Sequence, residues 1–172
     1  MKYFSGFCLQ NEQNLFDFWL EDSDFCVGGF SYGAIKAVEY ALNSDIRIDR
    51  LILLSPAFFN DRDDKFKRVQ LLYFKKDREK YIKNFLKNAL GRCDIDLNKY
   101  FREGSYSELK ELLYYKWEAN KIEILLKKGI VIEVILGQND RIVNVNKALE
   151  FFKNLTTTYY IKDANHFLKR CK

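Results

Sequence analysis

Short, almost wholly apolar runs alternate along the chain with segments whose apolar residues recur at helical spacing. The runs cover residues 25–30, 50–55 and 130–136, and each has the length of a strand. A continuous apolar run of this length is typical of a strand that is buried on both faces of a sheet. Two shorter strands are expected at residues 2–5 and 157–161, so the pattern predicts five strands.

The segments between these strands predict helices. Apolar residues lie on one helical face in residues 11–20, 32–42 and 145–153, and a last short helix is expected from Phe167. Strands that alternate with helices indicate a doubly wound parallel sheet, because parallel neighbours need a crossover between them. We therefore expect one α/β domain over residues 1–172, with about five parallel strands flanked by helices.

Residues 57–128 have a different composition, rich in charged and aromatic residues. Helical spacing occurs at residues 66–74, 81–90 and 109–126, and this region has no strand pattern. An insertion between two buried parallel strands leaves the sheet at its carboxyl edge, where open α/β sheets bind their ligands. The sequence therefore predicts a helical lid over that edge.

A candidate nucleophile stands between the second strand and the helix that follows it. Residues 29–33 form a GxSxG sequence centred on Ser31, in which the glycines leave room for a sharp strand-to-helix turn. Taken alone, the pattern also fits a turn serine that caps the next helix. Its place at the end of a buried strand favours Ser31 as a nucleophile.

A histidine and an acid follow the last two strands in the order that a Ser-Asp-His triad requires. His166 is the only histidine and follows the fifth strand, while Asp140 follows the fourth. Asp140 also fits a turn aspartate that caps a helix. Asp163 is a rival acid, but it precedes His166 in the same turn and is poorly placed to face the far ring nitrogen. We predict the triad Ser31, His166 and Asp140.

An oxyanion hole needs two backbone N–H donors directed at one point. One is expected from Tyr32, the residue after the nucleophile. The other is expected from Phe7, in a loop where Gly6 permits a sharp turn after the first strand.

These motifs together resemble an α/β-hydrolase over nearly the whole chain. The Ser5-Gly6-Phe7-Cys8 loop, the Gly-Phe-Ser-Tyr-Gly-Ala-Ile-Lys-Ala sequence around Ser31, the Asn-His-Phe-Leu sequence at His166 and the short length resemble the compact BioV type of pimeloyl-[acyl-carrier protein] methyl ester esterase. The larger BioH type has His-Gly-Trp-Gly at the first loop, so Phe7 takes the place of that tryptophan and the loop histidine is absent.

The resemblance implies a truncated fold and a specific reaction. The first two strands of the family are missing, and so are the strand and helix that usually precede the nucleophile strand. Because these three strands lie together in the family's sheet, their loss trims one edge and leaves five contiguous strands. The implied reaction is release of methanol from pimeloyl-[acyl-carrier protein] methyl ester in biotin biosynthesis, with no cofactor and no metal.

Basic residues outnumber acidic ones in the first half of the predicted lid. On charge alone, this excess suits a solvated helix face. The resemblance instead implies a surface that attracts an acidic acyl-carrier protein, with binding that weakens as salt is added. The expected carrier-binding residues are Lys65, Lys67, Arg68, Lys75 and Lys76.

Composition narrows the remaining possibilities. Charges of both signs lie behind the net charge of +5, so a nucleic-acid binder is not indicated, and the short apolar start is neither a signal peptide nor a membrane span. We expect a cytoplasmic protein, with a possible weak homodimer through the trimmed sheet edge. The four cysteines are Cys8, Cys26, Cys93 and Cys171. A zinc site is not expected, because these cysteines lack metal-ligand spacing, and disulfides are not expected, because nothing in the sequence suggests export.

Two other functions remain open on the sequence. One is a general carboxylesterase or thioesterase that uses the same triad on small acyl esters. The other is an inactive hydrolase-like module that binds an acidic partner through its lid.

Overall fold

The computed structural model describes residues 1–171 and contains one five-stranded sheet with the strand order β1-β2-β3-β4-β5. Every neighbouring pair of strands is parallel, which confirms the predicted sheet. Lys172, the last residue of the predicted domain, lies outside the described residues. The strands are β1 (Lys2–Phe4), β2 (Cys26–Phe30), β3 (Arg50–Leu54), β4 (Val131–Gly137) and β5 (Thr157–Ile161).

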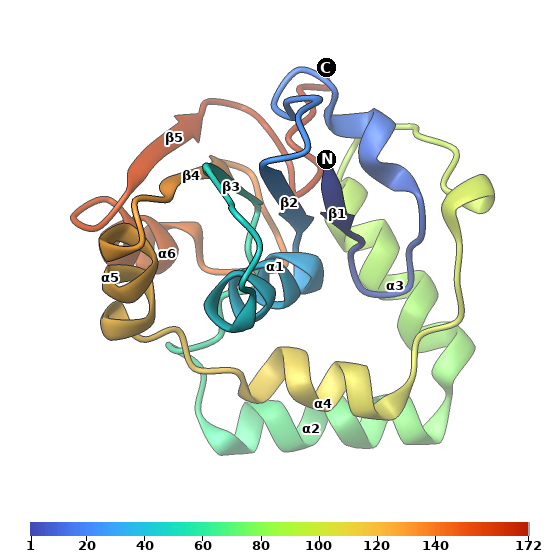
Figure 1. The fold of residues 1–172 in the computed structure, drawn as a ribbon. Helices are drawn as coiled ribbons and strands as arrows, with labels where there is room; N and C mark the ends of the chain where they lie inside the picture. Colours follow the sequence, from blue (N-terminus) through green and yellow to red (C-terminus); the bar gives the residue numbers. More distant parts are fainter. Residues whose placement is uncertain (172) are drawn as a thin grey trace.

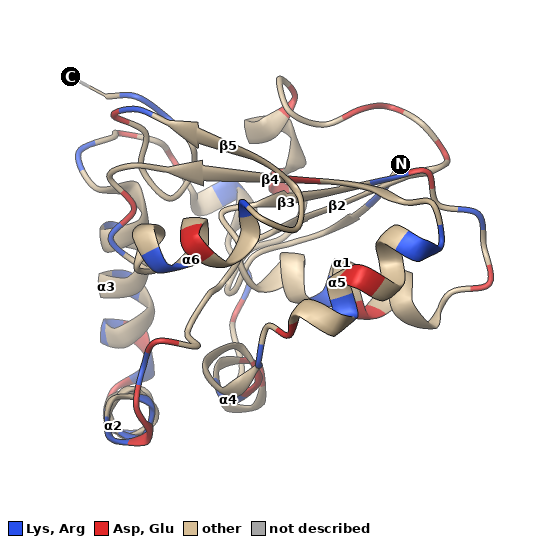
Figure 2. Cartoon of the chain, turned by 90° about the vertical axis from the view of Figure 1, so that its left-hand side faces the viewer, with Lys and Arg blue, Asp and Glu red and all other residues tan. Residues whose placement is uncertain are grey.

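Helices cover one face of this sheet and its carboxyl edge (Figures 1 and 2). Helices α1, α5 and α6 lie on one face, and α3 stands at the end toward which the β4 and β5 arrows point in Figure 2. The helices are α1 (Tyr32–Asn43), α2 (Asp64–Lys76), α3 (Arg78–Leu90), α4 (Tyr106–Tyr114), α5 (Ala119–Lys127) and α6 (Val145–Phe152), with short 3₁₀ helices η1 (Glu12–Phe16) and η2 (Asn98–Tyr100).

Alternating side chains of the central strands build a core on each side of the sheet. Leu51 and Leu53 pack with the α1, α5 and α6 side, whereas Ile52 and Leu54 pack with Phe16 of η1 on the other side. All four leucine and isoleucine side chains of β3 are at most 1% exposed. The continuous apolar run therefore reflects burial on both faces, as predicted.

The predicted lid region, residues 57–128, contains α2, α3, α4 and α5. Helices α2 and α4 lie side by side (Figure 1), whereas α5 packs on α1, so the name lid is used below for α2, α3 and α4. Its two ends are joined by Trp117, whose indole N–H donates to the Ala57 carbonyl at 2.9 Å. The Trp117 backbone also exchanges two hydrogen bonds with the Asn60 amide, at 2.8 and 3.0 Å. These contacts fix where the chain leaves the sheet and where it returns.

Three details differ from the predicted helices. Residues 109–126 form two helices instead of one, since the chain breaks at residues 115–118 where Trp117 is anchored. Residues 11–20 form only the η1 turn, which starts from Asn11 in a left-handed conformation and leaves Phe18 85% exposed. The helix expected from Phe167 does not form, because Leu168 takes a positive φ of 58°.

The connection from β1 to β2 is unusual in its hand. It packs η1 on the face opposite to α1, the helix that connects β2 to β3. Both connections nevertheless step in the same direction along the sheet. The two crossovers therefore have opposite hands, whereas nearly all crossovers between parallel strands share one hand. A missing strand and helix before β2 explains this geometry, because η1 must reach the adjacent strand directly.

A disulfide joins Cys93, just after α3, to Cys171 near the end of the described chain. The expectation that the chain has no disulfide was therefore wrong. The two cysteines are 78 residues apart, and only the fold brings their Cα atoms to 5.2 Å. Cys8 and Cys26 are buried free thiols.

Candidate active site

Ser31 occupies the sharp turn between β2 and α1, with a φ of 54° and a ψ of −111°. A Cβ on Gly29 would lie 2.3 Å from the Gly33 carbonyl oxygen, and one on Gly33 would lie 1.9 Å from the Phe4 carbonyl oxygen. Both glycines of the GxSxG pattern are therefore required, because any side chain at either position would clash with the backbone. The Ser31 N–H donates to the Leu54 carbonyl at 2.9 Å, which ties the turn to the end of β3.

The structure brings Ser31, His166 and Asp140 into one hydrogen-bonded chain. His166 Nε2 lies 2.9 Å from Ser31 Oγ, and His166 Nδ1 lies 2.5 Å from Asp140 Oδ2. Because a carboxylate only accepts hydrogen bonds, Nδ1 carries the proton and Nε2 is free to accept from the serine hydroxyl. The side chains of His166 and Asp140 are each 1% exposed, so water does not compete for these bonds.

The Asp140 carboxylate is held in place by the loop that follows β4. Its Oδ1 accepts the backbone N–H groups of Ile142 at 2.7 Å and Val143 at 3.2 Å. Asp163, the rival acid, has no bond to His166: its backbone N–H donates to Gln138 at 3.0 Å and the residue is exposed. Asp140 is therefore the acid that reaches the histidine.

The His166 turn is fixed by its neighbour Asn165. The Asn165 side chain donates to the Leu90 carbonyl at 2.7 Å and accepts the Lys169 N–H at 3.0 Å. The imidazole also packs against Phe30, with ring centroids 5.1 Å apart. These contacts join the histidine to the end of α3 and to β2, so its position depends on the lid as well as on β5.

Phe7 and Tyr32 both present backbone N–H groups that are free to act as donors. Within residues 1–171, neither N–H has a hydrogen-bond partner. The Tyr32 N–H lies in the first turn of α1, where helix N–H groups are unpaired and carry partial positive charge. The close approach of Gly33 to the Phe4 carbonyl brings the start of α1 against the end of β1, which leads into the Phe7 loop.

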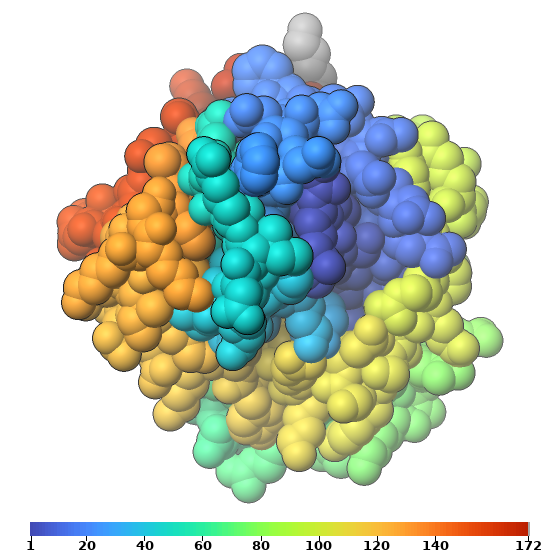
Figure 3. Space-filling model, viewed as in Figure 1, coloured from blue at the N-terminus to red at the C-terminus, as the bar shows by residue number. Residues whose placement is uncertain are grey.

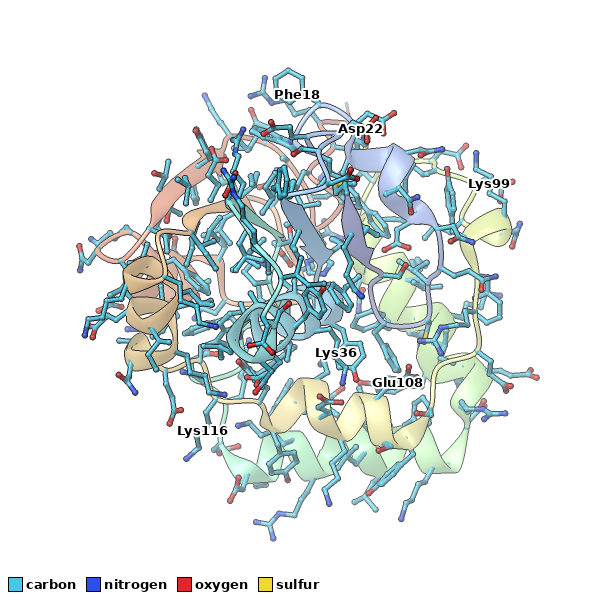
Figure 4. All side chains as sticks on the ribbon, in the orientation of Figure 1. Phe18, Asp22, Lys36, Lys99, Glu108 and Lys116 are labelled. Atoms are coloured by element: carbon cyan, nitrogen blue, oxygen red, sulfur yellow. A yellow bond between two sulfur atoms is a disulfide. The ribbon has the colours of Figure 1, made fainter. Side chains whose placement is uncertain are left out.

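The Tyr32 side chain links the lid to the nucleophile helix. Its hydroxyl donates to Glu111 of α4 at 2.5 Å, and Lys36 pairs with the same carboxylate at 2.7 Å. Burial raises the pKa of the Tyr32 phenol, and the bond to Glu111 raises it further. Figure 4 shows Lys36 directed toward α4, and Figure 3 shows the α4 segment, in yellow, covering the flank of the molecule below α1.

A cavity of about 630 Å³ lies among the lid helices and the loop after Asp140. Its walls combine aromatic side chains, among them Phe59, Phe66 and Phe85, with basic ones. A cavity of this size and mixed lining is typical of a site for a small organic molecule. The basic residues that line it are Arg62, Lys76, Lys80 and Arg141, and only Lys76 of these is among the expected carrier-binding residues.

The five residues expected to contact a carrier protein do not share one environment. Lys67 is only 6% exposed, and its ammonium lies 5.3 Å from the centroid of the Tyr114 ring. It packs between α2 and α4 and does not fit the expected surface contact. The other four are exposed along α2: Lys65, Arg68, Lys75 and Lys76.

No cluster of three or more His, Cys, Asp or Glu side chains in residues 1–171 has the arrangement of a metal site. No helix in the same part of the chain is both long and apolar enough to cross a bilayer.

The chain has the α/β-hydrolase fold in a truncated form. MenH from S. aureus superimposes with a TM-score of 0.60 at 15% identity, covering 95% of this chain and 85% of that protein. BioG from Haemophilus influenzae gives a TM-score of 0.58 at 14% identity, covering 96% and 87%. No protein-family model and no curated protein sequence matches the chain.

Longer relatives of the fold are matched only in part. The carboxylesterase CesB from Bacillus subtilis gives a TM-score of 0.54 at 17% identity, covering 83% of this chain and 53% of that protein. A Bacillus subtilis hydrolase gives the same TM-score of 0.54 and is covered over 54% of its length. The chain thus spans about half the length of these proteins. Identities this low establish the shared fold alone.

Proposed function

We propose that this protein is a serine carboxylesterase. The observation that carries the proposal is the hydrogen-bonded chain from Ser31 through His166 to Asp140 at the carboxyl edge of the sheet. His166 takes the Ser31 proton while the serine oxygen attacks the ester carbonyl, and Asp140 stabilises the imidazolium that forms. The N–H groups of Phe7 and Tyr32 donate to the oxyanion.

The second half of the reaction uses the same groups. His166 gives its proton to the departing alcohol, and the acyl group remains on Ser31. A water molecule then loses a proton to His166 and attacks the acyl-serine, which releases the acid and restores the serine hydroxyl. This chemistry needs neither a metal nor an organic cofactor.

We propose further that the ester is the methyl ester of pimeloyl-[acyl-carrier protein], with methanol as the leaving alcohol. Support comes from the resemblance to the BioV type and from the cavity beside the Asp140 loop, whose aromatic walls suit an acyl chain. Its basic lining suits the phosphate of the carrier's prosthetic arm. Four exposed cations of α2 would meet the acidic carrier: Lys65, Arg68, Lys75 and Lys76.

A second candidate is a carboxylesterase that acts on small free acyl esters. It is favoured by the likeness in fold to carboxylesterases such as CesB and by the apolar walls of the cavity. It needs no carrier protein and no basic lid. An inactive binding module has less support, since a scaffold without catalysis has no need of a serine, histidine and aspartate held in bonding distance.

The test compares methyl pimeloyl-[acyl-carrier protein] with a free methyl ester of the same acyl chain, followed by mass spectrometry. Wild type is expected to remove one methyl group from the carrier-linked ester, and Ser31→Ala to be slower by about a thousandfold or more. Hydrolysis of the carrier-linked ester is expected to slow with added salt, and that of the free ester to stay constant.

Charge reversal separates the two candidate substrates. Lys65→Glu with Arg68→Glu is expected to raise the KM for the carrier-linked ester about tenfold or more, and to leave the free ester unaffected. Lys127→Glu with Lys153→Glu, an equal charge change at two exposed positions outside α2, α3 and α4, is the matched control. Equal rates on both esters at all salt concentrations would overturn the carrier-linked substrate and support the general carboxylesterase. Failure of a fluorophosphonate probe to label Ser31 in folded protein would overturn both.

A further inference from the structure

Glu12 is a buried acidic residue that the proposed reaction does not use. Its side chain is 0% exposed, and no cation pairs with it within residues 1–171. One carboxylate oxygen, Oε1, accepts the Gly6 backbone N–H at 2.8 Å and the Tyr3 hydroxyl at 3.0 Å. The other oxygen, Oε2, has no hydrogen-bond partner among the described residues. Burial of a carboxylate costs free energy of folding, so the two hydrogen bonds that Glu12 accepts indicate a structural or functional role.

The contact with Gly6 lies at the base of the loop that presents the Phe7 N–H. Residues 6–9 form a tight turn, closed by a hydrogen bond of 3.1 Å from the Leu9 N–H to the Gly6 carbonyl. The carbonyl and N–H of a trans peptide point in opposite directions, and the described chain contains no cis peptide. Since the Gly6 carbonyl is turned inward, the Phe7 N–H is turned out of the loop.

This turn is not one that its own sequence favours. Cys8, its third residue, has a φ of 62°, a conformation that suits glycine and strains other residues. Such strain persists only where surrounding structure holds the backbone in place. The Cys8 carbonyl is held by the Arg102 N–H at 2.9 Å, and the Gly6 N–H is held by Glu12.

We propose that Glu12 is a positioning residue for the oxyanion hole. By accepting the Gly6 N–H, its carboxylate sets the direction of the next peptide and therefore of the Phe7 N–H. Tyr3 is a second donor to the same oxygen, and burial together with Glu12 raises the pKa of its phenol, so the hydroxyl keeps its proton. The inference rests on the proposed esterase function, because it assigns Phe7 to the oxyanion.

The test uses four variants and p-nitrophenyl acetate as the probe ester. Glu12→Met fills a similar volume without an acceptor, and is expected to lower kcat about a hundredfold with KM unchanged, as loss of one oxyanion donor does. Glu12→Asp shortens the side chain and is expected to lower kcat as well. Glu12→Gln keeps an acceptor for Gly6 and is expected to restore kcat to within about fivefold of wild type.

Tyr3→Phe is the matched control, because it removes the other donor from the same carboxylate and leaves the Gly6 bond. Its kcat is expected to stay within about twofold of wild type. The pH-rate profile of Glu12→Met is expected to keep its inflection points, since Glu12 does not contact His166 or Asp140. Amide exchange at Gly6, followed by NMR, is expected to speed up in Glu12→Met and Glu12→Asp.

Wild-type kcat in both Glu12→Met and Glu12→Asp would overturn the proposal, as would a Glu12→Gln loss equal to that of Glu12→Met. If Glu12→Met does not fold, the comparison of kcat between Glu12→Asp and Glu12→Gln tests the proposal. The exchange measurement is independent of turnover. Faster Gly6 exchange in variants of a chain whose wild type hydrolyses no ester would therefore refute the esterase function and leave the Glu12 contact established.

Discussion

At the scale of single residues, Asp140 uses its two oxygens differently. Oδ2 accepts from His166 Nδ1, while Oδ1 accepts two backbone N–H groups of its own loop. The loop therefore fixes the carboxylate without help from the histidine. A substitution that keeps the shape of the side chain should leave this geometry intact and change only the protonation pattern of the imidazole.

Asp140→Asn is expected to lower kcat by about 10³-fold to 10⁴-fold with little change in melting temperature. An amide that directs its N–H at Nδ1 forces the proton onto Nε2, which then has no lone pair for the Ser31 hydroxyl. Steady-state hydrolysis of p-nitrophenyl acetate measures the effect.

Asp163→Asn is the control, because Asp163 is an exposed acid in the His166 turn. It is expected to keep kcat within about twofold of wild type. If Asp140→Asn retained more than a tenth of wild-type kcat while Asp163→Asn did not, Asp163 would be the acid.

The triad was predictable because it follows from chain order. Parallel strands all deliver their carboxyl ends to one edge, so residues after β2, β4 and β5 had to meet there. The positions of Lys67 and Glu12 were not predictable in this way. Whether a charged side chain turns inward depends on packing between elements distant in sequence, such as Tyr114 against Lys67.

At the scale of elements, the return from the lid to the sheet depends on α5. Residues 109–126 have continuous helical spacing, but the Trp117 anchor divides them, and α5 packs on α1 instead of on the lid. The pattern predicted the apolar face correctly and missed the break, since the partners of Trp117 lie near residue 60. Lys121 and Tyr115 both bond to Glu39 of α1 at 2.7 Å.

Replacement of Glu39 by Gln is expected to have an effect that depends on pH. Partial burial raises the pKa of the Glu39 carboxyl, but the bonds from Lys121 and Tyr115 outweigh this and lower the pKa below its usual value. A lowered folded-state pKa stabilises the protein above the unfolded pKa, and this stability is lost as the pH falls through the folded value. At pH 7, Glu39→Gln should cost about 0.5–1 kcal/mol, as suits a half-exposed pair.

Urea unfolding between pH 7 and about pH 2.5 measures the difference between the two proteins, because the pH must fall through the lowered folded-state pKa of Glu39. The difference is expected to shrink as the pH falls. Glu123→Gln, an exposed glutamate of α5, is the control and should match wild type throughout. A Glu39→Gln penalty that stays constant or grows toward acid pH would contradict the assigned ion pair.

At the scale of the whole molecule, one face of the sheet carries little regular helix. On that face η1 and the irregular carboxyl-terminal segment replace regular helices, and Phe18 points outward at the top of Figure 4. The outer strand β1 has only three residues, and the weak homodimer expected through this edge stays a prediction. A domain with so little helix on one face gains from a covalent link, and the Cys93–Cys171 disulfide lies there.

The disulfide is expected to stabilise the fold without contributing to catalysis. It closes a chain segment of 78 residues, for which the loss of unfolded-state entropy corresponds to about 4.5 kcal/mol, and bridges of this kind typically stabilise a protein by about 2–4 kcal/mol. In a protein of this size, that amounts to a melting temperature about 5–15 °C higher. Activity at 25 °C should survive reduction, because Asn165 holds the His166 turn through its bonds to Leu90 and Lys169.

Thermal unfolding with and without dithiothreitol provides the measurement, and Cys93→Ser provides the control. Reduction should lower the wild-type melting temperature to that of Cys93→Ser, which should not respond to the reductant. Equal melting temperatures for oxidised wild type and Cys93→Ser would contradict a stabilising bridge. If reduction instead abolished activity in protein that remained folded, the His166 turn would depend on the bridge and not on Asn165.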